Sequence, residues 1–364
     1  MSRTSSRTFG ILTSGGDCPG LNAAIRGVAK PAVTRYGMTV IGIANGYRGL
    51  IEGTTRTLEA SAFDGLLTQG GTILGTSREK PFGEESLDGQ QKDSVVGRDK
   101  PEKIIKNYKA LGLDCLVILG GNGTQKTARL LADRGLNVIG LPKTIDNDLW
   151  GTDVTFGFHS AVDIATDAID RLHTTAHSHN RVMVIEVMGH KAGWLALYAG
   201  VAGGGDVILI PEIPYDPQNI ADHLTRRRSQ GKPFSIVVVA EGARSTQEAK
   251  RPKKKGLRAS ARSIGYRVAG EIEQLTGMES RVTVLGYQQR GGTPSAYDRV
   301  LATRFGTAAT EMIDRREYGK LVALKGTAIV SRPLEEIAGK LKLVPEDHEL
   351  ITTARAVGTC FGDG

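Results

Sequence analysis

Two aspartates two positions apart stand in the segment LPKTIDND, which covers residues 141–148 of this 364-residue chain. Carboxylates in such a loop can take a proton from a reacting group or hold a divalent cation. Lys143 and Thr144 come just before the pair and add a cation and a hydroxyl group. A solvated polar turn is the alternative, because surface loops are often this polar. The question is whether Asp146 and Asp148 do chemistry, and on what.

Glycine turns after apolar runs suggest that the chemistry concerns phosphate. GGDCPG (15–20), GGNG (120–123) and the dipeptide MG (188–189) each follow such a run. In open α/β sheets, ligands bind at the carboxyl ends of strands, where glycine lets backbone N–H groups approach a phosphate and a helix begins. The first turn matches neither the dinucleotide fingerprint nor the P-loop. A single turn of this kind is weak evidence, and their combination matters more.

The elements that must position these residues alternate between strands and helices. The predicted strands are nearly continuously apolar, as is typical of parallel strands covered on both faces. They cover residues 9–13, 39–44, 115–121, 138–142, 181–189, 206–211, 234–242 and 281–286. Helical stretches separate them, which is the βαβ rhythm. The sequence therefore predicts a doubly wound α/β protein, built from two such units.

Two helices are predicted directly after glycine turns. The first covers residues 22–37, and Pro31 should bend or shorten it because proline cannot donate the helical hydrogen bond. The second covers residues 124–135, with Thr124 as its cap. A polar insertion at 79–103 interrupts the alternation and has no assigned role.

Composition excludes several other classes of protein. Hydrophobic residues make up 40% and charged residues 24%, which is typical of a globular chain. No run approaches the roughly 20 apolar residues that a membrane span needs, and MSRTSSRT at the start lacks the apolar core of a secretion signal. Three cysteines without CxxC spacing favour a reducing cytoplasm and argue against a structural zinc site.

The formal net charge of +8 fits either nucleic acid or small phosphorylated substrates. The densest basic run, KRPKKKGLR at 250–258, contains no aromatic residue on which a base could stack. We therefore interpret it as a solvated loop and expect no nucleic-acid partner.

An ordered series of motifs along nearly the whole chain resembles the bacterial-type phosphofructokinase family. The motifs are GGDCPGLNAAIR, GGTILGTSR (70–78), LGGNGT, PKTIDND, SHNRVMVIEVMG, VVVAEGA, VLGYQQRGG (284–292) and YDRVLATRFG (297–306). The resemblance implies two Rossmann-like domains with the active site in the cleft between them. Residues 1–157 plus about 290–342 would bind the donor nucleotide. Residues 158–289 plus about 343–364 would bind fructose 6-phosphate.

The resemblance also implies roles for individual residues in a Mg²⁺-assisted phosphoryl transfer to the 1-hydroxyl of fructose 6-phosphate. Asp146 would accept the hydroxyl proton. Asp148 would orient Asp146 and, together with Asn122, would bind Mg²⁺. Thr144 would contact the transferring group, and Arg78 would neutralise its charge. The donor would be bound by Gly15, Arg78, Glu79, Gly121, Asn122, Gly123, Thr124 and Lys143.

For the sugar, the family's arginines for the 6-phosphate match Arg181, Arg281 and Arg290, since a planar guanidinium suits phosphate. Glu241 matches a carboxylate that holds sugar hydroxyls. The other residues expected at the sugar are Thr144, Ile145, Asp146, Met188, Gly189, His190, Tyr287, Gln288 and Gln289. In relatives, Arg181 and Arg281 correspond to residues that reach a neighbouring subunit. The resemblance therefore implies a homodimer or homotetramer.

Three residues depart from the usual family pattern. Many members have Asp at position 122, and an amide is a weaker ligand for a hard cation. Many also have His in place of Tyr287 and Arg in place of His190. Tyr287 can still donate a hydrogen bond, whereas His190 carries a pH-dependent charge. The change at position 122 would affect the affinity for the metal, and the changes at positions 190 and 287 would affect the affinity for the sugar.

The donor depends on positions 123 and 143. Pyrophosphate-using relatives usually have Asp at position 123, where the carboxylate repels the α-phosphate of a nucleotide; Gly123 leaves room for ATP. Lys143 is instead typical of pyrophosphate users, since ATP users usually have Gly. This mixture resembles the mixed-substrate group III of the family. We favour ATP, because steric exclusion is the harder constraint. Pyrophosphate and a non-catalytic sensor of sugar phosphate or nucleotide are the alternatives.

Overall fold

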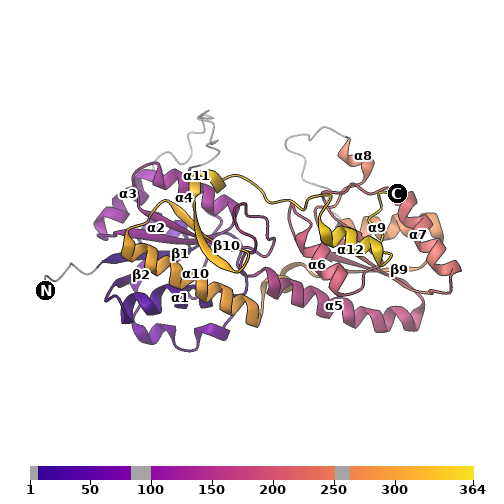
Figure 1. Cartoon of the computed structure of the whole chain (residues 1–364), viewed down its shortest axis with the longest axis horizontal. Coiled ribbons are helices and arrows are strands. Elements are labelled where there is room, and N and C mark those ends of the chain that lie inside the picture. The colour runs from indigo at the N-terminus through magenta and orange to yellow at the C-terminus, as the bar shows by residue number, and fades with distance from the viewer. Residues whose placement is uncertain (1–6, 83–99, 251–262) are drawn as a thin grey trace. The chain divides into compact units, whose positions relative to one another are not determined.

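A computed structural model describes residues 7–82, 100–250 and 263–364 of the chain (Figure 1). Most of the insertion at 79–103 and of the basic run at 250–258 lies outside these residues. The chain divides into two compact units. The first comprises Met1–Thr144, Leu149–Ser160 and Arg290–Leu341, and the second comprises Ile145–Asp148, Ala161–Gln289 and Lys342–Gly364. Which ligand each unit binds stays a prediction.

The first unit contains a seven-stranded mixed sheet in the order β11-β10-β5-β4-β1-β2-β3. Its strands are β1 (Thr8–Thr13), β2 (Thr39–Ile43), β3 (Thr55–Thr57), β4 (Cys115–Gly120), β5 (Val138–Pro142), β10 (Lys320–Lys325) and β11 (Ala328–Pro333). The five central strands are parallel, while the edge strands β3 and β11 are antiparallel to their neighbours. Every residue of β4 and β5 is buried, as the continuous apolar pattern predicts.

Helices cover both faces of this sheet (Figure 1). One face carries α1 (Leu21–Thr34) and α10 (Ala296–Arg315), and the other carries α2 (Tyr47–Glu52), α3 (Lys100–Ala110), α4 (Asn122–Ala132) and α11 (Leu334–Ile337). Two short 3₁₀ helices, η1 (Ala60–Phe63) and η2 (Leu66–Thr68), contact α1. A Cβ atom at Gly306 would lie 2.5 Å from the carbonyl carbon of Gly27, so these glycines allow α1 and α10 to pack backbone against backbone. Helix α1 continues three residues past Pro31 and ends before the predicted residue 37.

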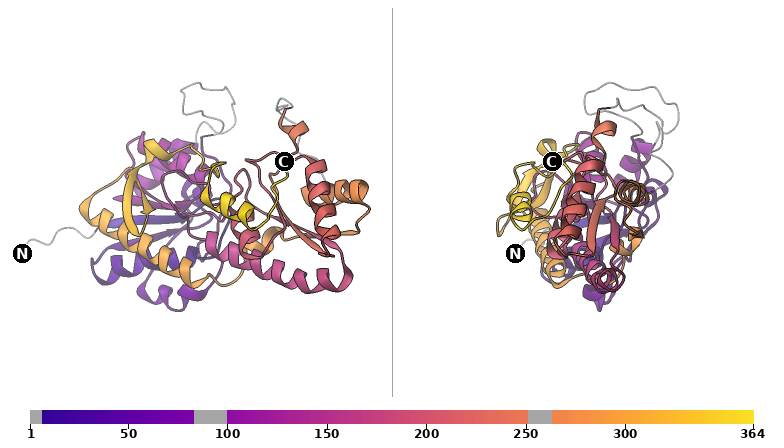
Figure 2. Two further views of the ribbon diagram at one scale, coloured as in Figure 1. Left: turned by 45° about the vertical axis from the view of Figure 1, so that its right-hand side comes forward. Right: turned by 90° about the vertical axis from the view of Figure 1, so that its right-hand side faces the viewer.

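The second unit contains a four-stranded parallel sheet in the order β7-β8-β6-β9. Its strands are β6 (Val182–Val187), β7 (Val207–Leu209), β8 (Ser235–Ala240) and β9 (Ser280–Val284). Its helices are α5 (Phe158–His179), α6 (Trp194–Ala202), α7 (Pro217–Ser229), α8 (Thr246–Ala249), α9 (Ile264–Thr276) and α12 (Glu349–Ala356), and residues Gly286–Arg290 form the 3₁₀ helix η3. The first three residues of α5 and the last residue of η3 belong to the first unit. Helices α7 and α9 pack together, as Figure 2 shows in a second orientation, and α6 packs on β7 and β8 from the opposite face.

All eight predicted strands are present, and the prediction of an α/β protein with two Rossmann-like units is confirmed. The sequence did not predict β3, β10 and β11. Among the described helices, none is both long and apolar enough to cross a membrane.

Candidate active site

The turn after β1 brings together several predicted donor residues in the first unit. Gly15 has a φ of 87°, a region that favours glycine, and its N–H donates to the Ser77 carbonyl at 2.9 Å. A Cβ atom at Gly15 would lie 3.5 Å from Thr124 Oγ1 and 3.7 Å from Lys143 Nζ. The buried Lys143 ammonium donates to the Gly16 carbonyl. The carboxyl ends of β1, β4 and β5 therefore converge, as expected for adjacent parallel strands.

Helix α4 begins at the second glycine turn, immediately after β4. Gly121 is the residue before the helix, so the predicted capping role of Thr124 is wrong. Thr124 lies within the first turn, and its Oγ1 donates to the Ser14 carbonyl at 3.3 Å. The first backbone N–H groups of an α-helix have no helical acceptor and carry partial positive charge, which attracts anions. This 11-residue helix therefore presents an N-terminus beside the Gly15 turn.

Gly123 and Asn122 lie at the start of α4 and differ in their surroundings. A Cβ atom at Gly123 would meet no atom of the described residues within 4 Å, so the space beside it is open with respect to that part of the chain. Asn122 Oδ1 accepts a hydrogen bond from the Gly339 N–H at 3.1 Å. An amide oxygen has two lone pairs, so Asn122 keeps one for another partner.

Three further predicted residues belong to the first unit. Arg78 is exposed and follows Ser77, whose carbonyl holds the Gly15 turn. Glu79 forms an ion pair with Lys100 at 2.8 Å. Arg290, which was expected to bind the sugar phosphate, donates from NH1 to the Asp17 carbonyl at 3.0 Å. The structure thus places Arg290 on the GGDCPG turn.

The segment after β5 carries the residues with which the sequence analysis began. Thr144 is buried; the Thr155 hydroxyl donates to its carbonyl at 2.7 Å. A Cβ atom at Gly121 would lie 3.7 Å from Thr144 Cβ, so this predicted contact to the transferring group borders the second glycine turn. Ile145, the next residue, is fully buried and belongs to the second unit.

Asp146 and Asp148 are both buried, with exposed fractions of 9% and 6%. Asn147 between them has a φ of 51°, a left-handed conformation that few residues other than glycine adopt. Burial, followed by the nearby charge of Asp146, raises the pKa of Asp148 to about 6, although His190 and Lys342 act in the opposite direction. A carboxyl group that ionises this close to neutrality is typical of a functional site.

Five of the predicted sugar residues of the second unit lie beyond the carboxyl ends of β6, β8 and β9. The His190 N–H donates to Glu241 Oε1 at 2.8 Å, and the Met188 N–H donates to Gln289 Oε1 at 2.9 Å. Gln289 is fully buried, and its Nε2 has no hydrogen-bond partner within the described part of the chain. A Cβ atom at Gly189, where φ is 143°, would lie 2.6 Å from the Ala192 carbonyl oxygen. The structure therefore brings these five residues together.

Arg181 and Arg281 also meet, and a residue that the sequence analysis missed joins them. Arg181 Nε lies 2.8 Å from Glu279 Oε2, and Arg281 NH2 pairs with the other carboxylate oxygen. The paired guanidinium groups lower the pKa of Glu279. Arg281 lies on β9, an edge strand of the sheet. Tyr287 and Gln288 follow this strand, and both are exposed.

The family model of phosphofructokinase matches residues 8–313 of the chain. The chain belongs to the phosphofructokinase family. A curated relative from Spirochaeta thermophila, named ATP-dependent 6-phosphofructokinase, is 69% identical, and the match covers the whole of both chains. The recognition from motifs is thereby confirmed.

Solved phosphofructokinase structures resemble the fold. A phosphofructokinase from Saccharomyces cerevisiae is 33% identical, with a TM-score of 0.78 over 91% of this chain and 45% of that one, so this chain spans less than half of the yeast chain. A pyrophosphate-dependent phosphofructokinase from Marinobacter aquaeolei is 26% identical, with a TM-score of 0.77 over 93% of this chain and 86% of that one.

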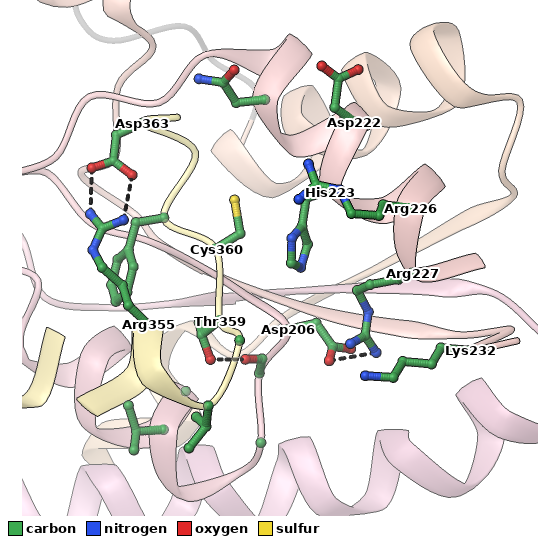
Figure 3. A pocket seen from close by; sticks show the side chains of 18 of the residues that line it. Asp206, Asp222, His223, Arg226, Arg227, Lys232, Arg355, Thr359, Cys360 and Asp363 are labelled. Carbon is green, nitrogen blue, oxygen red and sulfur yellow. Dashed lines mark hydrogen bonds and ion pairs between the residues drawn. The ribbon is translucent and has the colours of Figure 1, made fainter. Parts of the chain in front are cut away.

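The second unit of this phosphofructokinase also contains a cavity of about 610 Å³, lined by α7 and the C-terminal residues (Figure 3). Arg227 pairs with Asp206 at 2.7 Å on one side, and Arg355 pairs with Asp363 on the other. None of the residues predicted for the active site lines this cavity.

No group of three or more His, Cys, Asp or Glu side chains in the described residues is arranged to hold a metal ion.

Proposed function

We propose that this phosphofructokinase transfers the γ-phosphoryl group of ATP to the 1-hydroxyl of fructose 6-phosphate in glycolysis, which yields fructose 1,6-bisphosphate and ADP. The observation that carries the proposal is the buried pair Asp146 and Asp148 in the loop that follows β5, whose neighbour β4 ends in the GGNG turn. The name of the relative that matches the whole chain supports the same reaction.

Binding of the donor phosphates is assigned to the first unit. The N–H groups of Gly121–Thr124 would donate to the phosphates from the start of α4, and the Gly15 turn lies beside them. The exposed guanidinium of Arg78 would offset the charge of the transferring group. Glu79, the next residue in the chain, is also assigned to the donor site. These contacts position the γ-phosphorus for attack, which is most of what such a transfer requires.

Asp146 is the proposed general base. Its carboxylate would accept the proton of the 1-hydroxyl while that oxygen forms a bond to the γ-phosphorus and the bond to the ADP oxygen breaks. Thr144 would contact the transferring group, and Ile145 would line the same pocket.

The residues present fit a divalent cation. Burial and repulsion from Asp146 make ionisation of Asp148 costly, and a bound cation would relieve that cost. Asp148 and the second lone pair of Asn122 are the proposed protein ligands. Bound Mg²⁺ would offset the charge of the donor phosphates.

The sugar phosphate is assigned to Arg181, Arg281 and Arg290, with Glu241 on the sugar hydroxyls. Gln289 Nε2, which has no acceptor among the residues that the structure describes, supports this assignment, because a buried donor normally has an acceptor and a substrate oxygen would supply one. Met188, Gly189, His190, Tyr287 and Gln288 would complete the sugar site.

We propose a homodimer or homotetramer. Arg281 lies on the edge strand β9, and the exposed Tyr287 and Val284 lie at the same edge, where another chain could cover them. Light scattering after size-exclusion chromatography would measure the mass. Because the substrates belong to glycolysis, we propose a cytoplasmic location.

ATP is the proposed donor because the space beside Gly123 is open. Pyrophosphate is the second candidate, and Lys143 is the feature that favours it. Its ammonium is bonded to the Gly16 carbonyl, so it also has a structural role that is compatible with either donor.

Replacing Lys143 with methionine tests the role of its charge, since methionine keeps most of the volume. If Lys143 offsets the charge of pyrophosphate, Lys143→Met should abolish any pyrophosphate-linked rate and leave the ATP-linked rate within about threefold, less than 1 kcal/mol in transition-state binding. Steady-state rates with each donor measure this. Equal loss with both donors would refute the assignment.

The raised pKa of Asp148 predicts how the Mg²⁺ requirement depends on pH. A carboxyl must lose its proton to bind a metal. Because its pKa lies near 6 rather than 3.8, the proton competes with Mg²⁺ below pH 6. The Mg²⁺ concentration for half-maximal rate should rise by up to about tenfold per pH unit below that pKa. Measuring the rate as a function of Mg²⁺ concentration at pH values of roughly 7.5, 6 and 5, which bracket the pKa, tests this. A half-maximal Mg²⁺ concentration that did not change with pH would contradict it.

Parallel turnover assays with ATP or pyrophosphate, fructose 6-phosphate and Mg²⁺ test the proposed function. ATP-linked formation of fructose 1,6-bisphosphate is the expected result. Turnover only with pyrophosphate would reverse the donor, and tight binding without turnover of either would favour a sensor.

A further inference from the structure

Lys342 contacts the loop of the two aspartates through both its backbone and its side chain. Its N–H donates to the Asp148 carbonyl at 2.9 Å, and its Nζ donates to Asn147 Oδ1 at 3.0 Å. All three residues belong to the second unit. A hydrogen bond from an ammonium group is stronger than one between neutral groups. Lys342 therefore holds both Asn147 and Asp148, although it lies 194 positions after Asp148 in the chain.

Trp194 in turn holds Lys342. The indole Nε1–H donates to the Lys342 carbonyl at 2.8 Å, and Lys342 Nζ lies 5.4 Å from the centre of the indole ring. An ammonium group at this distance from tryptophan is attracted by the ring. Trp194 is buried at the start of α6, and its ring contacts the edge of His348 at 5.1 Å between ring centres. Trp194 therefore contacts both the backbone and the ammonium end of Lys342.

The conformation of Asn147 explains why this support matters. Its φ of 51° lies in the left-handed region, which asparagine adopts more readily than most residues but less readily than glycine, so contacts from the surroundings help to stabilise it. Because Asn147 separates Asp146 from Asp148, its backbone angles set the directions in which the two carboxylates leave the chain. A shift of about 1 Å in a catalytic group can lower a rate by about 10²-fold.

We propose that Lys342 is a positioning residue for phosphoryl transfer: its ammonium group, seated on Trp194, holds Asn147 in the left-handed conformation and so fixes Asp146 in the geometry for proton removal. The inference rests on the proposed function, in which Asp146 is the base. Lys342 acts through Asn147, and this distinguishes it from the catalytic residues.

Lys342→Met removes the ammonium but keeps the backbone bonds and the length of the side chain. We expect kcat to fall by about 10- to 100-fold, with the KM for fructose 6-phosphate within about twofold. Lys342→Arg keeps a cation that can bond Asn147 and stack on Trp194, and it should restore kcat to within about threefold of the wild type. Lys340→Met is the matched control, since Lys340 is an exposed lysine two positions earlier, and its kcat should not change.

A double-mutant cycle identifies Asn147 as the link. Glycine adopts a positive φ without strain, so in an Asn147→Gly background the loop no longer needs the lysine to hold that conformation. Adding Lys342→Met to Asn147→Gly should then cost at most about threefold in kcat, less than it costs in the wild type. A loss of equal size in both backgrounds would overturn the proposal.

Hydrogen exchange of the peptide that covers residues 143–150 gives a readout that does not depend on activity. Lys342→Met should speed exchange in this peptide several-fold, whereas Lys340→Met should leave it unchanged. Wild-type kcat together with unchanged exchange in Lys342→Met would overturn the inference. If the wild type phosphorylated no sugar with either donor, the proposed function would fail, but exchange would still decide whether Lys342 holds the loop.

Discussion

Replacing Asp146 with asparagine is expected to lower kcat for phosphorylation of fructose 6-phosphate by about 10²- to 10⁴-fold, the contribution of a general base. Asparagine has nearly the same shape and can still form hydrogen bonds, but it cannot take the proton of the 1-hydroxyl. The KM for the sugar should change little, because arginines rather than Asp146 are proposed to bind its phosphate. Steady-state kinetics with saturating ATP would measure both constants.

Asp153→Asn is the control for this substitution. Asp153 lies seven positions later and is exposed, and its carboxylate accepts from the Gly326 N–H at 2.7 Å, a bond that asparagine can keep. Its kcat should stay within about twofold, the range of a neutral surface change. A mild effect at Asp146, comparable with that at Asp153, would remove Asp146 from the role of base.

Replacing Gly123 with aspartate should exclude ATP. Two unit charges about 4 Å apart repel by about 4 kcal/mol at an effective dielectric constant of 20. Solvent at this exposed site reduces the repulsion, so we expect about 2 kcal/mol or more, a loss of about 30-fold or more in kcat/KM for ATP. Pyrophosphate lacks the α-phosphate of a nucleotide, so any rate with it should fall less.

Gly123→Ala separates charge from size at this position. A Cβ atom there meets nothing within 4 Å in the part of the chain that the structure describes, so alanine should keep kcat/KM for ATP within about threefold. If alanine and aspartate lowered it equally, repulsion of the α-phosphate would not explain donor choice.

Much of the fold could be predicted because the strands that surround the site are buried on both faces. Strands such as β4 and β5 contain only buried residues, so their apolar runs stand out in the sequence. Strand β11 alternates between exposed and half-buried residues at the edge of the sheet, and β3 has only three residues. Their patterns are too weak or too short to separate from loops.

The residues of the candidate site also fall into those that the sequence could predict and those that it missed. The proposed site residues stand in short motifs at strand ends, so the sequence could predict that Gly15, Thr124 and Lys143 lie close together. Lys342 and Glu279 stand in no such motif, and their partners come from distant parts of the chain. The cap of α4 was misplaced because a glycine, without any side-chain acceptor, precedes the helix.

A structure with fructose 6-phosphate and a non-hydrolysable ATP analogue tests the central claim most directly. We predict a carboxylate oxygen of Asp146 within about 2.6–3.2 Å of the 1-hydroxyl oxygen, with the triphosphate on the N–H groups of Gly121–Thr124 and an adenine beyond Gly123. A sugar whose 1-hydroxyl faced another group, or a triphosphate bound away from the start of α4, would contradict the account.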